Sequence, residues 1–242
     1  MVAAGILADV DYFLAAHLGI SALESGLCAC GTHGFAPTTK LDARFTGKAA
    51  HAGVEPQAGR NALLAAATAT VQLHALSRHG NGYSRVNVGV FEGGSARNVV
   101  AERASLKLEV RGETDAINDD MVVAARRVLR GAAEIHGVKV EVEIAGHAGA
   151  ASCDPAFVAV VRRAAESLPA ARTVDSLPMG GSEDATLMMT AVQARGGQAT
   201  YVLVGTPLSA GHHQTRFDFD EGALAFGVGL GAATARELLG SE

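Results

Sequence analysis

Apolar and polar residues alternate in four segments in the middle of the chain. The alternation runs through residues 41–46, 86–90, 104–110 and 138–144. Because successive side chains of a strand point to opposite faces, each segment predicts a strand with one buried and one solvated face. Four such strands indicate a sheet that is covered on one side only.

Two longer segments between these strands carry apolar residues three and four positions apart. They span residues 61–79 and 115–136. Each has a single apolar stripe, which predicts an amphipathic helix that covers the dry face of the sheet. The order of elements is then βαββαβ, the ferredoxin-like arrangement of a split βαβ unit. We expect residues 39–147 to form this domain.

The segments on either side of that domain have a different pattern. Residues 10–16 and 199–204 are nearly continuous apolar runs, which are typical of strands buried on both faces. Helical patterns follow in three places: residues 155–167, 183–195 and 221–239. Residues 1–38 and 148–242 therefore indicate parts of an α/β domain into which the ferredoxin-like domain is inserted. They hold too few strands for a covered parallel sheet, so we expect this outer α/β domain to be incomplete.

The composition narrows the class of protein. Hydrophobic residues make up 48% of the 242 positions, enough for a folded core, so a disordered chain is excluded. The formal charge is −5 and no long basic run occurs, which argues against a nucleic-acid binder. No apolar run reaches the roughly 18 residues of a membrane span, and the first residues lack the basic flank of a signal peptide. Three cysteines are too few for a disulfide scaffold, so we expect a cytoplasmic globular protein.

Histidines are the main chemical resource of the chain, and four of them stand out. His212 and His213 form a pair on a glycine-flanked loop after the apolar run at 199–204, a fair position for metal ligands. His17 ends the other buried strand, and strand ends in α/β sheets are where ligands gather. His51 lies among small residues that allow close approach to a ligand, with a plain loop histidine as the alternative. The others are expected to be structural or merely exposed: His33, His74, His79, His136 and His147.

Other catalytic classes find little support. The Gly-Gly pairs at 93–94 and 180–181 match neither a dinucleotide fingerprint nor a phosphate loop, and no G-x-S-x-G elbow occurs. Cys28 and Cys30 could form a redox or metal-binding pair, but a pair of buried thiols at the end of a strand is the preferred interpretation. Residues 182–184 have the sequence Ser-Glu-Asp and resemble a capping pattern at the start of a helix.

Several motifs together point to a known family. They include the segment Phe45-Thr46-Gly47-Lys48-Ala49-Ala50-His51-Ala52-Gly53 and residues 10–17, 61–67, 85–90, 97–100, 181–189, 211–213 and 217–221. With these motifs the chain resembles the dinuclear metal-dependent amidohydrolases and peptidases that carry an inserted lid and dimerisation domain. The resemblance covers essentially all 242 residues.

The resemblance implies roles for individual residues. His17 and His213 would be metal ligands, and His213 is preferred to His212 because of its distance to Phe217. His51 would be the lid histidine that reaches into the partner subunit's active site and polarises the scissile carbonyl. The substrate would be contacted by Asn98, Arg111, Gly181 and Ser182. Among these, Arg111 would bind a substrate carboxylate through two parallel hydrogen bonds.

The resemblance also implies an activity, a cofactor and an assembly. The activity is hydrolysis of the amide of an N-acyl amino acid such as p-aminobenzoyl-glutamate, with a divalent metal, manganese or zinc. The assembly is a homodimer joined through the lid domain, with neither a nucleic-acid nor a membrane partner.

The chain departs from the family in one important respect. Family members have a Cys-Gly-His-Asp ligand motif and a Glu-Glu pair that includes the general base, and neither occurs in this sequence. The chain therefore resembles the C-terminal portion of the enzyme, and we expect it to be inactive alone. Two alternatives stay open: a separate polypeptide complements this half-enzyme, or the chain is a non-catalytic dimerisation or ligand-binding module.

Overall fold

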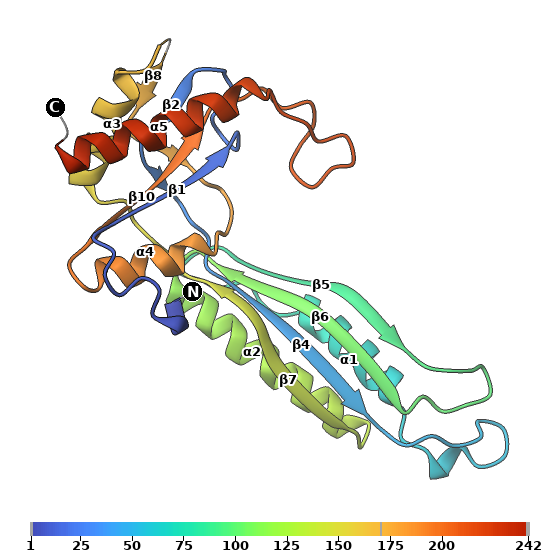
Figure 1. Cartoon of the computed structure of the whole chain (residues 1–242). Helices are drawn as coiled ribbons and strands as arrows, with labels where there is room; N and C mark the ends of the chain where they lie inside the picture. Colours follow the sequence, from blue (N-terminus) through green and yellow to red (C-terminus); the bar gives the residue numbers. More distant parts are fainter. Residues whose placement is uncertain (1, 170, 241–242) are drawn as a thin grey trace. The chain divides into compact units, whose positions relative to one another are not determined.

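The chain folds into two structural units in the computed structural model (Figure 1). The structure describes residues 2–169 and 171–240. The inserted unit comprises Ala36–Ala148, and the flanking unit comprises the residues before and after it. The inserted unit thus begins three residues before the range 39–147 expected from the sequence. The reason is that Thr38 already pairs with Arg111 in the sheet of the inserted unit.

The inserted unit has the predicted βαββαβ order. Its elements are β4 (Thr38–Thr46), the short η2 (Pro56–Ala58), α1 (Ala62–His74), β5 (Ser84–Gly93), β6 (Arg103–Gly112), α2 (Asp115–Ile135) and β7 (Lys139–Ala148). The strands pair antiparallel in the order β5-β6-β4-β7, which is the ferredoxin-like topology. Both helices pack against this sheet (Figure 1). The fold class inferred from the alternating pattern is confirmed for this unit.

The core of the inserted unit lies between the sheet and its two helices. Leu41 and Phe45 of β4 and Leu106 of β6 are almost completely buried there. α1 contributes mainly alanines to this core, whereas α2 contributes larger side chains such as Met121 and Leu129. The small residues allow α1 to lie close to the strands, because no long side chain separates the helix from the sheet.

The helix α1 ends at His74, five residues before the predicted end at His79. Its start is as expected, because the Leu64 N–H donates to Asn61 Oδ1 over 3.1 Å and so caps the helix. Beyond the helix, the His79 N–H donates to Ser84 Oγ over 2.9 Å, so a local polar contact replaces a helical hydrogen bond.

The flanking unit has the α/β architecture expected from its apolar runs. Its elements are η1 (Val2–Ala4), β1 (Tyr12–Leu18), β2 (Leu27–Ala29), β3 (Thr32–His33), α3 (Pro155–Glu166), β8 (Arg172–Val174), β9 (Leu177–Pro178), α4 (Ala185–Gln193), β10 (Gln198–Val204) and α5 (Gly222–Leu239). One sheet has the order β1-β10-β2-β8, and β3 and β9 form a second small sheet. β1 and β10 run parallel. β10 is buried along almost its whole length, as expected for a strand apolar on both faces, whereas no residue of β1 is fully buried, so the burial expected for β1 is not found.

Helices cover both faces of the larger sheet. Tyr201 and Leu203 of β10 pack in a cluster with Met189 of α4, whereas Val202 points the other way and packs with Phe157 of α3 and Leu230 of α5. This alternation explains why β10 has a continuous apolar sequence.

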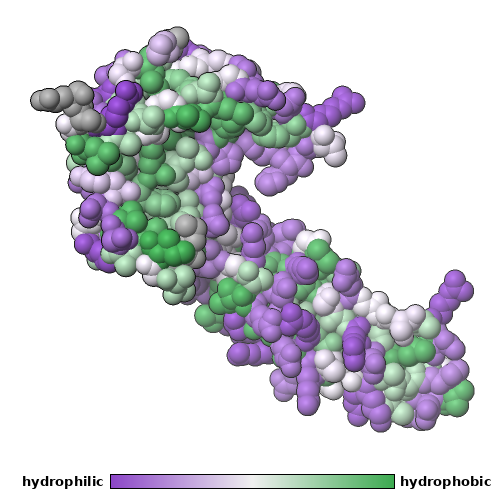
Figure 2. All heavy atoms as spheres, viewed as in Figure 1, coloured by the Kyte–Doolittle hydropathy of each residue, from purple (hydrophilic) through white to green (hydrophobic). Residues whose placement is uncertain are grey.

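Part of the flanking unit remains uncovered. Leu224 and Val228 of α5 are 49% and 75% exposed, and Figure 2 shows hydrophobic residues along this helix. Such an apolar helix is typical of a buried position. β1 pairs with β10 only, so its second edge has no strand partner among the described residues. Despite its apolar character, neither α5 nor any other helix within residues 2–169 and 171–240 is long and apolar enough to cross a membrane.

Truncation of a side chain in the core of the inserted unit tests the packing. Leu106 is fully buried in the centre of the sheet, so Leu106→Ala should lower the free energy of unfolding by about 2–5 kcal/mol. Val123 is 63% exposed on α2, and the control Val123→Ala should change that free energy by less than about 0.5 kcal/mol. Urea denaturation followed by circular dichroism measures both. Equal effects of the two variants would contradict the assigned core.

Candidate functional site

Three histidines of the flanking unit gather around one hollow. His17 comes from β1, and His212 and His213 come from the loop that follows β10. The hollow has a volume of about 600 Å³ and is also lined by Gln214, Thr215 and Phe217. The rings of His17 and His212 meet edge to face with 5.4 Å between their centroids. The structure therefore brings together the histidines that the sequence singled out at the two strand ends.

Strand register positions His17. The residue pairs with Leu203 of β10, and just beyond it the Gly19 N–H donates to Val204 O over 2.9 Å. The Nδ1 atom of His17 lies 2.8 Å from the carbonyl oxygen of Leu18. Since a carbonyl oxygen only accepts, Nδ1 carries the proton, and the neutral ring keeps a lone pair on Nε2. That lone pair is what a metal ion requires from imidazole.

The surroundings of His212 favour its neutral form. Its ring packs against Phe217 with 4.9 Å between the centroids, and its Nε2 atom is buried with no hydrogen-bond partner among the described residues. Burial, together with the neighbouring His17 and His213, lowers the pKa of His212. His213 has a positive φ of 65°, a left-handed conformation that is uncommon for a residue with a side chain. The preference for His213 over His212 as a ligand stays a prediction.

The histidines do not complete a metal site by themselves. Within residues 2–169 and 171–240, no group of three or more His, Cys, Asp or Glu side chains is arranged to hold a metal ion. A dinuclear centre needs further ligands, and carboxylates are the usual bridging and charge-balancing groups. The residues present therefore supply imidazoles only.

The predicted substrate residues Gly181 and Ser182 lie in the loop that leads into α4. The neighbouring Glu183 is fixed by the sheet, because the hydroxyl of the buried Tyr201 donates to Glu183 Oε2 over 2.8 Å. The N-cap of α4 is Asp184, whose side chain makes no capping hydrogen bond. The Asp184 side chain therefore does not cap α4, and the Glu183 side chain is instead anchored to Tyr201.

His51 and Asn98 lie next to each other in the inserted unit. The Ala52 N–H donates to Asn98 O over 2.9 Å, and His51 forms an isolated bridge with Val99. The Gly53 N–H donates to His51 Nδ1 over 3.2 Å, so Nδ1 is the acceptor and Nε2 carries the proton of the neutral ring. His51 is exposed and therefore presents an N–H donor to its surroundings.

Arg111 lies at the opposite end of the same sheet. It pairs with Thr38 at the start of β4, whereas Arg103 pairs with Thr46 at the end that leads to His51. The eight residue steps between Arg103 and Arg111 on β6 correspond to roughly 26 Å. Within one chain, the structure does not bring Arg111 together with His51 and Asn98.

Arg85 is a candidate that the sequence analysis missed. It stands directly opposite Arg111 in the β5–β6 pair, and both side chains lie on the face of the sheet away from the helices. The Arg111 Nε–H donates to Glu109 Oε1 over 2.9 Å. The alternating pattern could place Arg85 on the open face, but only the register between the strands places it beside Arg111.

Comparisons with known proteins agree on one family. The family described as the peptidase dimerisation domain of M20 proteins matches residues 38–136. The chain is 50% identical over 237 residues to a p-aminobenzoyl-glutamate hydrolase subunit of Escherichia coli and 49% identical to indole-3-acetyl-aspartic acid hydrolase of Enterobacter agglomerans. The chain belongs to the M20 family. These alignments cover 97% of the chain but 54% of each relative, so the M20 chain spans about half their length.

Solved structures of M20 proteins support the fold. The aminobenzoyl-glutamate utilization protein from Klebsiella pneumoniae is 45% identical and has a TM-score of 0.85, over 97% of this chain and 56% of that one. A Bacillus subtilis protein described as a dinuclear metal binding peptidase of the M20 family has a TM-score of 0.67 at 21% identity, covering 100% of this chain and 61% of that one. The recognition of the family and of a partial catalytic domain is thus confirmed.

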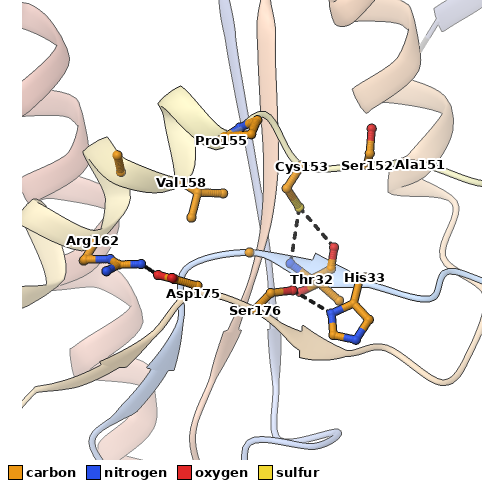
Figure 3. A pocket seen from close by; sticks show the side chains of 12 residues that line it. Thr32, His33, Ala151, Ser152, Cys153, Pro155, Val158, Arg162, Asp175 and Ser176 are labelled. Carbon is orange, nitrogen blue, oxygen red and sulfur yellow. Dashed lines mark hydrogen bonds and ion pairs between the residues drawn. The ribbon is translucent and has the colours of Figure 1, made fainter.

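A second hollow of this M20 chain lies elsewhere in the flanking unit (Figure 3). It has a volume of about 430 Å³ and is lined by Cys153 and by two polar pairs. In one pair His33 Nδ1 lies 2.7 Å from Ser176 Oγ, and in the other Arg162 forms an ion pair with Asp175. None of the residues predicted for catalysis or metal binding lines it. Two other cysteines, Cys28 and Cys30, are buried on and next to β2, as the sequence indicated.

Removal of the Tyr201 hydroxyl tests the anchor of the Glu183 loop. Tyr201→Phe leaves the half-buried Glu183 carboxylate without its donor, so the free energy of unfolding should decrease by about 1–3 kcal/mol at neutral pH. The control Tyr12→Phe alters a tyrosine that is 45% exposed and should have little effect. Urea denaturation measures both variants.

The same variant has a signature at alkaline pH. Burial, and next the hydrogen bond to Glu183, raises the pKa of Tyr201 in the folded chain. An unfolded tyrosine loses its proton near pH ~10, so the unfolded state holds fewer protons above that pH and stability decreases as pH rises. Tyr201→Phe should show a smaller decrease between neutral pH and pH ~11 than the unmodified chain. An identical decrease would contradict the buried, hydrogen-bonded state of Tyr201.

Proposed function

We propose that this M20 chain takes part in the hydrolysis of the amide bond of an N-acyl amino acid with an aromatic acyl group, such as p-aminobenzoyl-glutamate. The observation that carries the proposal is a hollow with three histidines in a chain 50% identical to the Escherichia coli p-aminobenzoyl-glutamate hydrolase protein. Indole-3-acetyl-aspartic acid hydrolase, at 49% identity, has a substrate of the same kind by its name. Both substrates join an aromatic acyl group to an acidic amino acid.

The histidines would form one side of the metal site. His17 and His213 are proposed as ligands to manganese or zinc, both of which accept imidazole. When bound, the metal ions supply a nucleophilic water and polarise the scissile carbonyl. Because the described residues complete no metal site, the carboxylate ligands and the general base are proposed to come from the part of the catalytic domain that this chain does not match. The chain alone should have negligible hydrolase activity.

His51 is proposed to stabilise the carbonyl oxygen of the substrate during attack. Its Nε2–H is a donor on an exposed loop, and a fixed donor to a developing oxyanion lowers the barrier of acyl transfer. Asn98 lies beside it and adds a second polar side chain at this end of the sheet. Gly181 and Ser182 are proposed to line the substrate, on the loop that Tyr201 anchors.

A homodimer would explain the separation of the proposed substrate residues. Arg111 lies roughly 26 Å from Arg103, which is at the other end of β6. That other end leads to His51, so His51 and Arg111 do not reach one small substrate from the same chain. If two copies join antiparallel at an edge strand, the far end of one sheet lies level with the near end of the other. His51 from one copy and Arg111 from the other can then serve the same site.

The edge formed by β5 and α1 is the better candidate for this contact. In a two-fold interface a residue near the symmetry axis lies close to its own copy, so a charged residue there meets a like charge. α1 carries no Asp, Glu, Lys or Arg, yet Leu64 and Val71 are 51% and 66% exposed on it. At the other edge, α2 carries charged residues along its length: Asp115, Asp119, Asp120, Arg126, Arg127, Arg130 and Glu134.

The uncovered surface of the flanking unit favours complementation as a second candidate. The outer face of α5 is apolar and exposed, and β1 has an unpaired edge. The relatives contain additional sequence amounting to almost half their length, which this chain does not match. A polypeptide with that half of the catalytic domain would pair with β1, cover α5 and supply the ligands that His17 lacks.

A charge placed on α1 tests the proposed dimer edge. Val71→Lys puts two ammonium groups into the contact, so the dissociation constant of the dimer should rise by about 100-fold or more. Val123→Lys is a matched control, because Val123 is 63% exposed on α2 and should leave the dimer intact. Sedimentation equilibrium measures both. Dissociation of the Val123→Lys dimer with an intact Val71→Lys dimer would assign the contact to the other edge.

Reconstitution tests the hydrolase proposal. The chain is mixed with the part of the Escherichia coli relative that it does not match, in the presence of manganese, and p-aminobenzoyl-glutamate hydrolysis is followed by absorbance. We expect turnover in the mixture and none with the chain alone. His17→Ala and His213→Ala should lower the rate by about 100-fold or more because each removes a ligand. The control His79→Ala should not.

Two other results of this experiment are informative. Turnover by the chain alone at the rate of the mixture would contradict the proposal that it is half of a site. A stable complex without turnover would favour a non-catalytic dimerisation or binding module.

A further inference from the structure

Two arginines face each other across neighbouring strands of the inserted unit. Arg85 of β5 and Arg111 of β6 are direct partners in the antiparallel register and project from the open face of the sheet. Directly opposed residues have Cβ atoms only about 5 Å apart, and like charges in such positions destabilise a sheet. The arrangement therefore has a cost in the free chain that a bound anion would offset.

The carboxylates nearby neutralise the pair only in part. Glu109 accepts a hydrogen bond from Arg111 Nε over 2.9 Å and is also opposite Lys40 of β4. Glu113 accepts the Tyr83 N–H over 2.9 Å. Arg85 forms no ion pair with any carboxylate of the described residues.

Arg85 is nevertheless held in place. Its Cζ atom lies 5.6 Å from the centre of the Tyr83 ring, and its Nη1–H donates to Ser84 O over 2.8 Å. A cation over an aromatic ring gains electrostatic stabilisation and loses freedom of movement. A guanidinium group that is fixed in this way and keeps further N–H donors is suited to bind a carboxylate through two parallel hydrogen bonds.

We propose that Arg85 determines specificity for an acidic amino acid by binding its side-chain carboxylate, while Arg111 binds the α-carboxylate. This inference rests on the proposed function. An aspartate or glutamate conjugate has two carboxylates, as many as the arginines in the pair, whereas a conjugate of a neutral amino acid has one. The names of the two relatives contain one acidic amino acid each, glutamate and aspartate.

The test compares two ligands that differ in one group. p-Aminobenzoyl-glutamate and p-aminobenzoyl-glutamine have the same shape, but the second has an amide in place of the side-chain carboxylate. Calorimetric titration of the full chain with each ligand gives a ratio of dissociation constants. The unmodified chain should bind the glutamate conjugate about 10-fold more tightly or better, and Arg85→Gln should lower this ratio about 10-fold.

Two further variants separate recognition from folding. Arg85→Lys keeps the positive charge but loses the two parallel N–H donors of the guanidinium group, so it should retain part of the preference for the glutamate conjugate. Arg103→Gln removes an arginine that is 85% exposed on the same face of β6 but at its other end, and it should leave the ratio unchanged. Circular dichroism verifies that each variant is folded.

The ligand titrations test the proposed role of Arg85 without requiring catalysis. A chain without preference for the glutamate conjugate would overturn it, and so would an Arg85→Gln variant that weakens both ligands equally. The measurement needs no turnover. A chain that prefers the glutamate conjugate but shows no hydrolysis in the reconstituted mixture would therefore support this inference and contradict the proposed hydrolase.

Discussion

The parallel pairing of β1 with β10 is the contact on which the flanking unit depends. It joins Tyr12–Leu18 to Gln198–Val204, two segments that the whole inserted unit separates in the sequence. The register sets His17 opposite Leu203, close to the point where the chain leaves β10 for the loop that carries His212. A shift by one residue would turn His17 to the other face of the sheet. The histidine hollow is therefore a consequence of strand register as much as of the histidines themselves.

The inserted unit depends on a different constraint, the burial of one face of an antiparallel sheet. Because its helices cover that face, the other face is free for polar side chains along the full length of the strands. The same strand length that gives the unit its core puts Arg111 roughly 26 Å from Arg103, at the end of the sheet opposite to the one that leads to His51. The proposed substrate residues at the two ends of this sheet can meet at one substrate only if a second copy of the chain lies antiparallel to the first. Homodimerisation and substrate binding are therefore parts of one proposal.

One-sided burial explains how much of the fold the sequence could predict. The alternation around Leu41 and Leu106 and the helical stripes place every strand and α-helix of the inserted unit, because burial of one face imposes these periods. The pattern failed after His74, because α1 ends there and the His79 backbone N–H instead donates to the Ser84 side chain. It also gave no sign that Tyr201 holds Glu183, because the two residues meet only after α4 and β10 are packed. For the candidate site, the two strand ends pointed to the histidines, whereas Arg85 became visible only through the register of β5 and β6.

The flanking unit lacks both cover for the apolar surface of α5 and carboxylate ligands beside its histidines, and one missing half-domain would account for both. Burial of a Leu or Val side chain contributes about 1.5–3 kcal/mol, so the exposed Leu224, Val228 and Leu239 of α5 leave roughly 3–6 kcal/mol of burial unrealised after allowance for their present partial cover. That amount is comparable to the whole stability of a marginal domain. The hollow of His17 and His212 likewise is lined by imidazoles but by no carboxylate, and the described residues complete no metal site. A half-domain that extends the sheet at β1 and covers α5 would bury these apolar side chains. Carboxylates at the ends of its strands would lie beside the histidines and complete the proposed metal site. The same association should therefore increase stability and allow catalysis.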